Sequence, residues 1–269
     1  MFNAEIKKLE PAIRCYQSAD GQFTNWPLND CLFGVPPDAQ YGRKPLDAVP
    51  PAAEGFHFYL GSDATGLLEA FVGSDCARQA VRLSVGDSCY RKGSGRDYAA
   101  IVEILSAGAF PVLRYFSLGV WQLFSNSHCA YGRLGELGTL FAAMPGLEAL
   151  SLHGQFSLAS AASFPRLKTL DIQADDPITG INGGAVPAAA VSSLFSSDFP
   201  RLEEAYIDLE VDESEERYAL PEAFCAGSSC PSLHRLEYSG ALAPGEAERL
   251  ESGPLSQRQG MTLFVEDTG

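Results

Sequence analysis

The sequence has no long apolar run, no dense cysteine framework and no excess of basic residues. No stretch approaches the roughly 18 to 20 consecutive apolar residues of a membrane helix. The first residues, MFNAEIKKLE, contain two lysines with no apolar run after them, so we expect no cleaved export signal. The 7 cysteines are an odd number scattered over 269 residues, unlike the disulfide framework of a small secreted domain. We therefore expect a cytoplasmic protein.

The shortage of basic residues restricts the choice of partner. The formal net charge is −15, and nucleic acids and anionic membranes are bound largely through lysine and arginine. Neither is an expected partner. Residues 201–269 contain 15 Asp and Glu against 5 Arg, whereas residues 1–200 contain 19 acidic against 14 basic residues. Two thirds of the net charge thus lies in the last quarter of the chain.

One string suggests catalysis. Gly86-Asp87-Ser88 follows an apolar run and resembles the nucleophile block of the GDS-type esterases. Such a resemblance implies a downstream histidine base with a paired aspartate and an oxyanion hole, and no Asp-x-x-His occurs in the chain. A turn formed by Asp87 and Ser88 is the alternative interpretation. A hydrolase with dispersed catalytic residues stays open as an alternative function.

The other candidate ligand sites lack their defining residues. The glycine-rich residues 91–96 have no Gly-Lys-Ser/Thr ending for a phosphate loop. The 4 histidines are far apart, and Cys225 and Cys230, whose pairing stays open, lack two further zinc ligands nearby. The acidic string at residues 208–216 lacks the central glycine of a calcium loop. It is either a solvated loop or a docking site for a basic partner. We expect no metal, no cofactor, no catalytic residue and no enzyme activity.

An internal phrase recurs along the chain: an apolar residue, two variable residues, an apolar residue, a variable residue and an apolar residue, often after proline. The clear copies are PVLRYFSL (111–118), PGLEALSL (145–152), PRLKTLDI (165–172), PRLEEAYI (200–207) and PSLHRLEY (231–238). Fainter copies are AVRLSV, from Ala80, and GMTLFV (260–265).

The copies define a common phase. The equivalent residues are Ala80, Leu113, Leu147, Leu167, Leu202, Leu233 and Gly260, at steps of 33, 34, 20, 35, 31 and 27. Each phrase ends in an alternating run, which predicts a strand with one buried face. Proline suits the first position of such a strand. We predict helices between strands, over residues 97–107 with Asp97 as N-cap, 134–143, 187–197 and 244–251. The short step from 147 to 167 predicts a return by a loop or a 3₁₀ turn.

Strand and helix alternating at this period predict an α/β solenoid with a parallel sheet on its concave face and helices or loops on its convex face. The phrases resemble leucine-rich repeats, and the chain is similar to bacterial leucine-rich-repeat-like cytoplasmic proteins of unknown function. The resemblance covers residues 80–269 and implies an interaction module. The asparagine that usually follows the strand is missing, and its place falls around Gly119, Gly154, Ala174, Leu209 and Gly240. We therefore expect an irregular solenoid.

Residues 1–79 differ from the repeats. The first 55 residues are rich in proline and have little periodicity, so we interpret residues 1–79 as a capping region over a solenoid of residues 80–269. The segments GFHFYLG (55–61) and LLEAFVG (67–73) are predicted strands that belong to the cap or begin the stack.

Variable positions of the predicted strands should line the concave face, because alternate side chains point away from the core. This row changes from small and neutral to acidic along the chain, with Tyr206 as an aromatic anchor. We predict that it captures a basic surface of a protein partner; an immunity or inhibitor protein that neutralises a toxin enzyme is an alternative. The predicted partner-binding residues are Tyr115, His153, Asp171, Gln173, Glu204, Tyr206, Asp208, Arg235 and Glu237.

Overall fold

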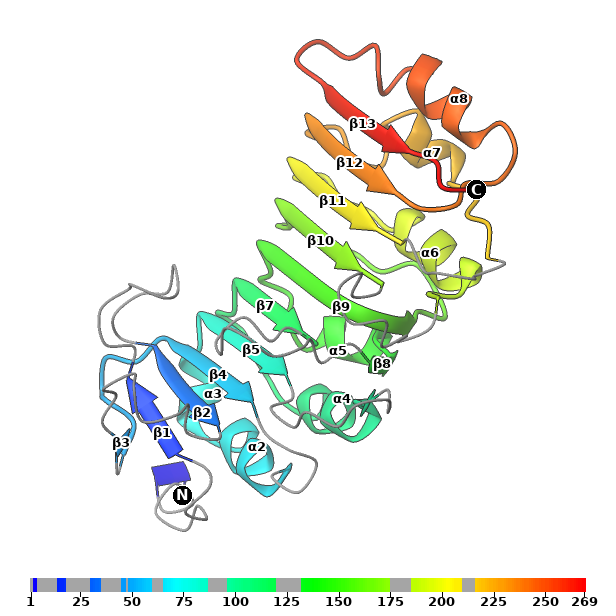
Figure 1. Ribbon diagram of the computed structural model, residues 1–269. Helices are drawn as coiled ribbons and strands as arrows, with labels where there is room; N and C mark the ends of the chain where they lie inside the picture. Colours follow the sequence, from blue (N-terminus) through cyan, green and yellow to red (C-terminus); the bar gives the residue numbers. More distant parts are fainter. Residues whose placement is uncertain are drawn as a thin grey trace.

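The computed structural model describes residues 2–3, 14–17, 30–34, 45–46, 48–59, 65–86, 96–119, 132–174, 185–209 and 216–269. It is a mixed α/β fold built on one long sheet with nine parallel strands (Figure 1). In order across the sheet these are β2 (Cys31–Gly34), β4 (Gly55–Tyr59), β5 (Arg82–Gly86), β7 (Tyr115–Leu118), β9 (Ala149–Ser157), β10 (Thr169–Gln173), β11 (Glu204–Asp208), β12 (Arg235–Ser239) and β13 (Thr262–Glu266).

Four short strands complete the sheet. At the N-terminal end, β1 (Arg14–Gln17) pairs antiparallel with β2 and with β3 (Pro45–Leu46). In the middle, β8 (Gly132–Glu136) pairs parallel with the second half of β9 and with β6 (Arg96–Asp97). The arrangement is compatible with a solenoid, since each strand of the parallel set lies beside its neighbour in the sequence.

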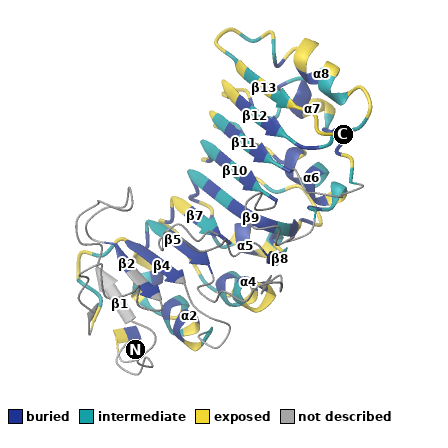
Figure 2. Cartoon of the chain, in the orientation of Figure 1, coloured by how far each residue is buried: buried dark blue, intermediate teal, exposed yellow. Residues whose placement is uncertain are grey.

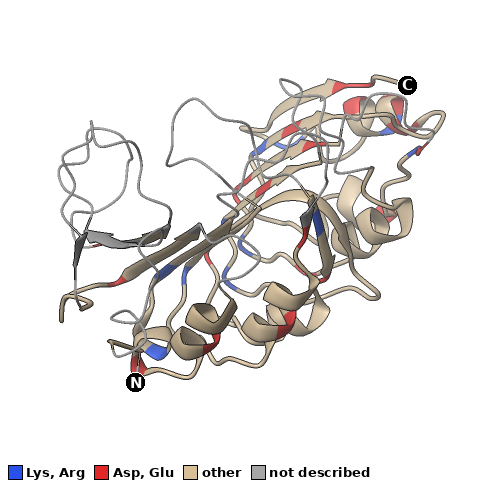
Figure 3. Cartoon of the chain, turned by 60° about the horizontal axis from the view of Figure 1, so that its bottom comes forward, with Lys and Arg blue, Asp and Glu red and all other residues tan. Residues whose placement is uncertain are grey.

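The helices lie on one side of the sheet (Figures 1 and 3). They are α2 (Thr65–Val72), α3 (Asp75–Gln79), α4 (Ala99–Ser106), α5 (Gly138–Ala142), α6 (Ala188–Phe195), α7 (Glu222–Cys225) and α8 (Glu246–Ser252). None of the helices in the described ranges is long and apolar enough to cross a membrane. We call the opposite side of the sheet the open face.

The strand register aligns the core side chains of successive strands in rows. Arg82 pairs with Tyr115 and Tyr115 with Ala149, steps of 33 and 34 residues, and the later pairings likewise follow the phase expected from the sequence. Alternate residues therefore form continuous rows on each face. The second and fourth residues of the strands β4, β5, β7 and β9 to β12, such as Leu170 and Ile172, are buried under the helices, as the dark bands of Figure 2 show.

The recurring proline heads a turn rather than the strand itself. Leu113 donates its backbone N–H to the carbonyl of Phe110, and Leu167 likewise to Phe164, so the intervening proline is the second residue of each turn. Proline suits this position because its fixed φ matches the turn. The strand begins two residues after the turn and four residues after the proline, at Tyr115 and Thr169. The expectation that proline takes the first position of the strand was therefore wrong.

The residue before each proline is buried and forms part of a second apolar row. The ring of Phe164 stacks on that of Phe199 with centroids 5.2 Å apart and contacts that of Phe141 edge-on at 5.0 Å. The Phe-Pro pairs thus combine a turn with a large core side chain. This explains why the phrase recurs although the length between copies varies.

Two secondary-structure predictions were wrong. Residues 67–72 belong to helix α2 rather than to a strand, because Leu67, Leu68 and Phe71 lie on one helical face and the ring of Phe71 packs 4.9 Å from that of Phe56. Short apolar runs leave this choice ambiguous. Residues 134–143 begin as strand β8 and become helical only at Gly138, since pairing with β9 outweighs the helical pattern.

Other predicted elements agree with the structure within a few residues. Helix α6 lies inside the range 187–197, and α8 overlaps 244–251. Helix α4 begins at Ala99 with Tyr98 as its N-cap, so the prediction of Asp97 as N-cap was wrong by one residue, although the Asp97 carboxylate accepts from the N–H of Ala99 at 2.9 Å. The linker from β9 to β10 contains no helix in the described residues 158–168. Strand β4 pairs parallel with β5 and β2 with β4, so the parallel sheet runs across residue 80.

Candidate functional site

The third residues of the parallel strands β5, β7 and β9 to β13 form a central row on the open face, and the same register continues to the buried His57 on β4. Along the pairing register this row contains Ser84, Ser117, Ser151, Asp171, Tyr206, Glu237 and Phe264. The row begins with three hydroxyl side chains and ends with carboxylates and aromatic rings. The chemistry of the open face therefore changes between β9 and β10.

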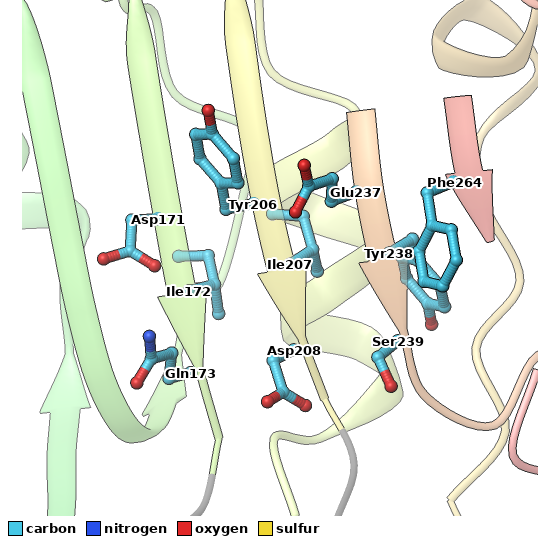
Figure 4. Close-up of a pocket in the computed structure, with 10 residues that line it drawn as sticks. All are labelled: Asp171, Ile172, Gln173, Tyr206, Ile207, Asp208, Glu237, Tyr238, Ser239 and Phe264. Atoms are coloured by element: carbon cyan, nitrogen blue, oxygen red, sulfur yellow. The ribbon is translucent and has the colours of Figure 1, made fainter. Parts of the chain in front are cut away.

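A shallow hollow of about 160 Å³ lies over β10 to β13 at the acidic end of this row. The side chains of Asp171, Tyr206, Glu237 and Phe264 border it on the central row, and Gln173, Asp208 and Ser239 border it on the next row (Figure 4). We call this the acidic hollow. Its carboxylates come from three different strands, so the strand register fixes their spacing.

Tyr206 makes two side-chain contacts at the acidic hollow. Its hydroxyl donates to Glu204 Oε2 at 3.0 Å, and the guanidinium of Arg235 lies 5.2 Å from the centre of its ring. Arg235 also donates through Nε to Glu237 Oε1 at 2.9 Å. Desolvation and the hydrogen bond to Glu204 raise the pKa of Tyr206.

The hollow borders a buried histidine on its β9 side. His153 is only 4% exposed, and its Nε2 lies 3.3 Å from Asp171 Oδ2. A protonated ring would make this an ion pair, and a neutral ring with hydrogen on Nε2 would donate to the same oxygen. In either form His153 orients the Asp171 carboxylate and offers little surface of its own.

The structure brings most of the predicted partner-binding residues together. Asp171, Gln173, Tyr206, Asp208 and Glu237 line the hollow, and Glu204 and Arg235 contact its tyrosine or glutamate. The other two predicted residues, Tyr115 and His153, do not line the hollow.

Tyr115 is 45% exposed but lies on β7, separated from β10 by β9. His153 is buried instead of presented to solvent. Neighbouring side chains decide such burial, and an alternating pattern alone does not reveal it.

Sequence reasoning missed Phe264, which is 57% exposed and borders the hollow. The phase that ends in the copy at Gly260 places residue 264 opposite Glu237, and the observed pairing is the same. The signal was therefore present. Carrying the open-face row through the last, faint copy would have found this residue.

The two close cysteines are free thiols. Cys225 and Cys230 are both buried and form no disulfide. Burial raises the pKa of Cys225 and raises that of Cys230 to about 11, so both are protonated at neutral pH and are weak nucleophiles. In the part of the chain that the structure describes, no group of three or more His, Cys, Asp or Glu is placed to hold a metal ion.

Three candidates from the sequence lie wholly or mostly outside the described residues. They are Asp87-Ser88, the glycine-rich residues 91–95, and residues 210–215 of the acidic string. Asp208 and Glu216, the first and last residues of that string, are described. The open-face site uses Asp208 and none of residues 210–215.

Comparison with known proteins gives little further guidance. No family model and no curated protein matches the chain. A solved structure of a protein from Bacteroides fragilis is similar over 95% of this chain and 96% of its own, with 11% sequence identity and a TM-score of 0.41.

Proposed function

We propose that the chain is a leucine-rich-repeat-like interaction module whose open face binds a basic surface of another protein, centred on the acidic hollow. The observation that carries the proposal is the set of carboxylates around Tyr206. Asp171, Glu204, Asp208 and Glu237 come from adjacent positions on three strands, and Arg235 is the one cationic side chain among them.

Arg235 supports a basic partner because it shows the binding mode within the molecule. Its guanidinium lies over the Tyr206 ring and donates to Glu237, which combines a cation–π contact with a charge-assisted hydrogen bond. An arginine of a partner can use the Asp171 side of the same ring in the same way. Arginine and tyrosine are the residues on which protein interfaces most often depend.

The shape of the hollow favours a protein over a small molecule. Small-molecule sites are typically enclosed clefts of roughly 300–1,000 Å³, whereas the acidic hollow holds about 160 Å³ and opens onto a flat sheet. A larger partner would contact the hollow and the rows beside it together. Exposed Phe264 adds an apolar contact to the charged centre.

Affinity capture with a triple variant tests this proposal. Glu204→Ala, Tyr206→Ala and Asp208→Ala together remove two carboxylates and the aromatic ring from the surface of β11. We expect the purified triple variant to lose the partner that the parent chain captures from the source cell, and the thermal midpoint to stay nearly unchanged. We also expect high salt to release the partner from the parent chain, since exposed charge pairs are screened.

The matched control removes two carboxylates from the helix side. Glu248→Ala with Glu251→Ala changes exposed residues of α8 and should leave capture intact. Retained capture by the β11 triple variant, or equal loss in the α8 control, would refute the open-face site. A captured enzyme that the chain inhibits would identify the chain as an inhibitor of that enzyme.

A further inference from the structure

Strand β13 is the end of the parallel sheet, and its outer edge pairs with no strand of the described residues. The core rows are incomplete there. Leu263 and Val265 are only half-buried, although the residues that pair with them in register on β12, Leu236 and Tyr238, are fully buried. On the open face Phe264 is 57% exposed. The last strand therefore presents an unfinished apolar surface.

The hydrogen bonds to β12 show which peptide groups point outward. Thr262 donates its N–H to the carbonyl of His234 at 2.8 Å, and the carbonyl of Glu266 accepts from Gly240 at 3.1 Å. In a parallel pair alternate residues bond to the same neighbour. The peptide groups of Thr262, Phe264 and Glu266 therefore face β12, and those of Leu263 and Val265 face outward.

This edge lacks lysine, proline and a bulge, three of the features that commonly protect an exposed edge from pairing. Its strand carries one charged residue, Glu266. Residues 259–269 contain no lysine, arginine or proline, and β13 pairs with β12 in an unbroken register of five residues. A second extended strand can approach this edge without meeting an obstacle of these kinds.

We infer that β13 pairs antiparallel with β13 of a second copy of the chain, about a twofold axis at Phe264. In this register Leu263 lies opposite Val265 of the other copy. Their outward peptide groups then exchange both hydrogen bonds, and the symmetric pair does the same. The register that satisfies the twofold axis is thus also the one that satisfies the outward donors and acceptors.

The side chains of this edge are complementary to themselves in the same register. Phe264 meets Phe264 of the second copy as a close cross-strand pair, and aromatic pairs stabilise sheets. Glu266 lies opposite Thr262, and Asp267 opposite Met261. No acidic residue therefore faces its counterpart, although this quarter of the chain carries most of the negative charge.

The dimer joins the two sheets and keeps both open faces on the same side, because opposed residues of an antiparallel pair point to the same face. Phe264 borders the acidic hollow, so each hollow would lie next to the phenylalanine of the other copy. The two hollows together form one extended binding surface. The dimer itself does not depend on the proposed partner.

Sedimentation equilibrium of the full chain with a proline variant tests the inference. Val265→Pro removes an outward N–H that β12 does not use, so the strand keeps its own pairing. Val265→Ala is the matched control, because it loses the same apolar side chain and keeps the N–H. We expect a concentration-dependent dimer for the parent, and a dissociation constant roughly tenfold or more higher for Val265→Pro than for Val265→Ala.

Cysteine substitution gives a second measurement that does not depend on the proline variant. Phe264→Cys should form a disulfide-linked dimer under mild oxidation, because residues in a close antiparallel pair are about 4.5 Å apart at Cα. Thr262→Cys lies opposite Glu266 and should not, and the parent chain controls for its native cysteines.

A parent that is monomeric up to its solubility limit, or cross-linking by Thr262→Cys in place of Phe264→Cys, would overturn the inference. The triple variant Glu204→Ala, Tyr206→Ala and Asp208→Ala should still dimerise, which separates this inference from the proposed function.

Discussion

At the scale of single residues, the most constrained polar group is the Asp30 carboxylate beside β2. It accepts from His57 Nε2 at 2.9 Å and from Arg82 through Nε at 2.9 Å and Nη2 at 2.7 Å. The carboxylate lies where a Cβ on Gly55 would be, within 2.1 Å. Asp30 and His57 are almost fully buried. Glycine at position 55 therefore makes room for a carboxylate whose charge is satisfied by side chains of two neighbouring strands, His57 on β4 and Arg82 on β5.

This cluster predicts a loss of stability on mild acidification. Burial lowers the pKa of His57 against the opposing effect of Asp30, so the unfolded chain binds a proton at a higher pH than the folded chain. The unfolding free energy should then fall as pH drops below about 6.5, with a slope of up to about 1.4 kcal/mol per pH unit. The pKa of Asp30 is also lowered, and its contribution is lost only below about pH 4.

Urea denaturation between pH 7.5 and 5.5 measures this slope. His57→Gln should flatten it, because the titrating group is gone. His234→Gln, at an exposed position, should keep the slope of the parent. Equal slopes in the parent and in His57→Gln would show that the cluster does not control the acid response.

Gly119 allows a second prediction at this scale. Its φ of +81° is in the left-handed region, and a Cβ there would lie 2.0 Å from the carbonyl oxygen of His153. Gly119→Ala should cost about 1–3 kcal/mol of unfolding free energy. Gly245→Ala is the matched control, because φ is +83° with nothing within 4 Å of the added Cβ. The difference between the two midpoints in urea isolates the contact, and an equal loss in both would contradict it.

At the scale of elements, the pairing of strands was predictable and the connections between them were less so. The phrase around Leu147, Leu167 and Leu202 is repeated closely enough to align the strands, because buried rows require the same alternation in each copy. The segments at 67–73 and 134–143 were misassigned, since pairing and packing with distant residues decided them. The sequence of a short apolar segment does not show which distant residues it will contact.

The Phe-Pro turns predict where the stack is most sensitive to truncation. Phe164 is buried between Phe141 and Phe199, so Phe164→Ala should lower the unfolding free energy by about 3–5 kcal/mol. Phe264→Ala removes the same side chain from an exposed position and should change the stability of the monomer by no more than about 0.5 kcal/mol. Urea denaturation at low protein concentration compares the two. Similar losses would show that the aromatic row is not a core.

At the scale of the whole molecule, the candidate site follows from the register more than from any motif. Asp171, Tyr206 and Glu237 are 35 and 31 residues apart, yet they share one row because those are the steps between their strands. The sequence could therefore predict which residues meet. It could not predict the burial of His153, which depends on surrounding side chains, or the hollow, which depends on their shapes.

The uneven charge of the molecule predicts how fast a basic ligand associates. Residues 201–269 contain 15 of the 34 acidic residues and 5 of the 19 basic residues, and Figure 3 shows acidic segments on the C-terminal strands and on α8. Such a field steers a cationic ligand toward one end of the molecule. The association rate of an arginine-rich peptide should fall steeply as salt rises, and the dissociation rate should change less.

Stopped-flow kinetics with that peptide separates the long-range field from the contacts at the hollow. Glu248→Gln with Glu251→Gln on α8 weakens the field and leaves the hollow intact, so it should slow association modestly without speeding dissociation. Glu204→Gln with Asp208→Gln removes the same charge at the hollow and should also speed dissociation, because close contacts set the lifetime of a complex. If the two pairs behave alike, the peptide is held by the overall charge of the C-terminal quarter, and the hollow has no specific role in binding it.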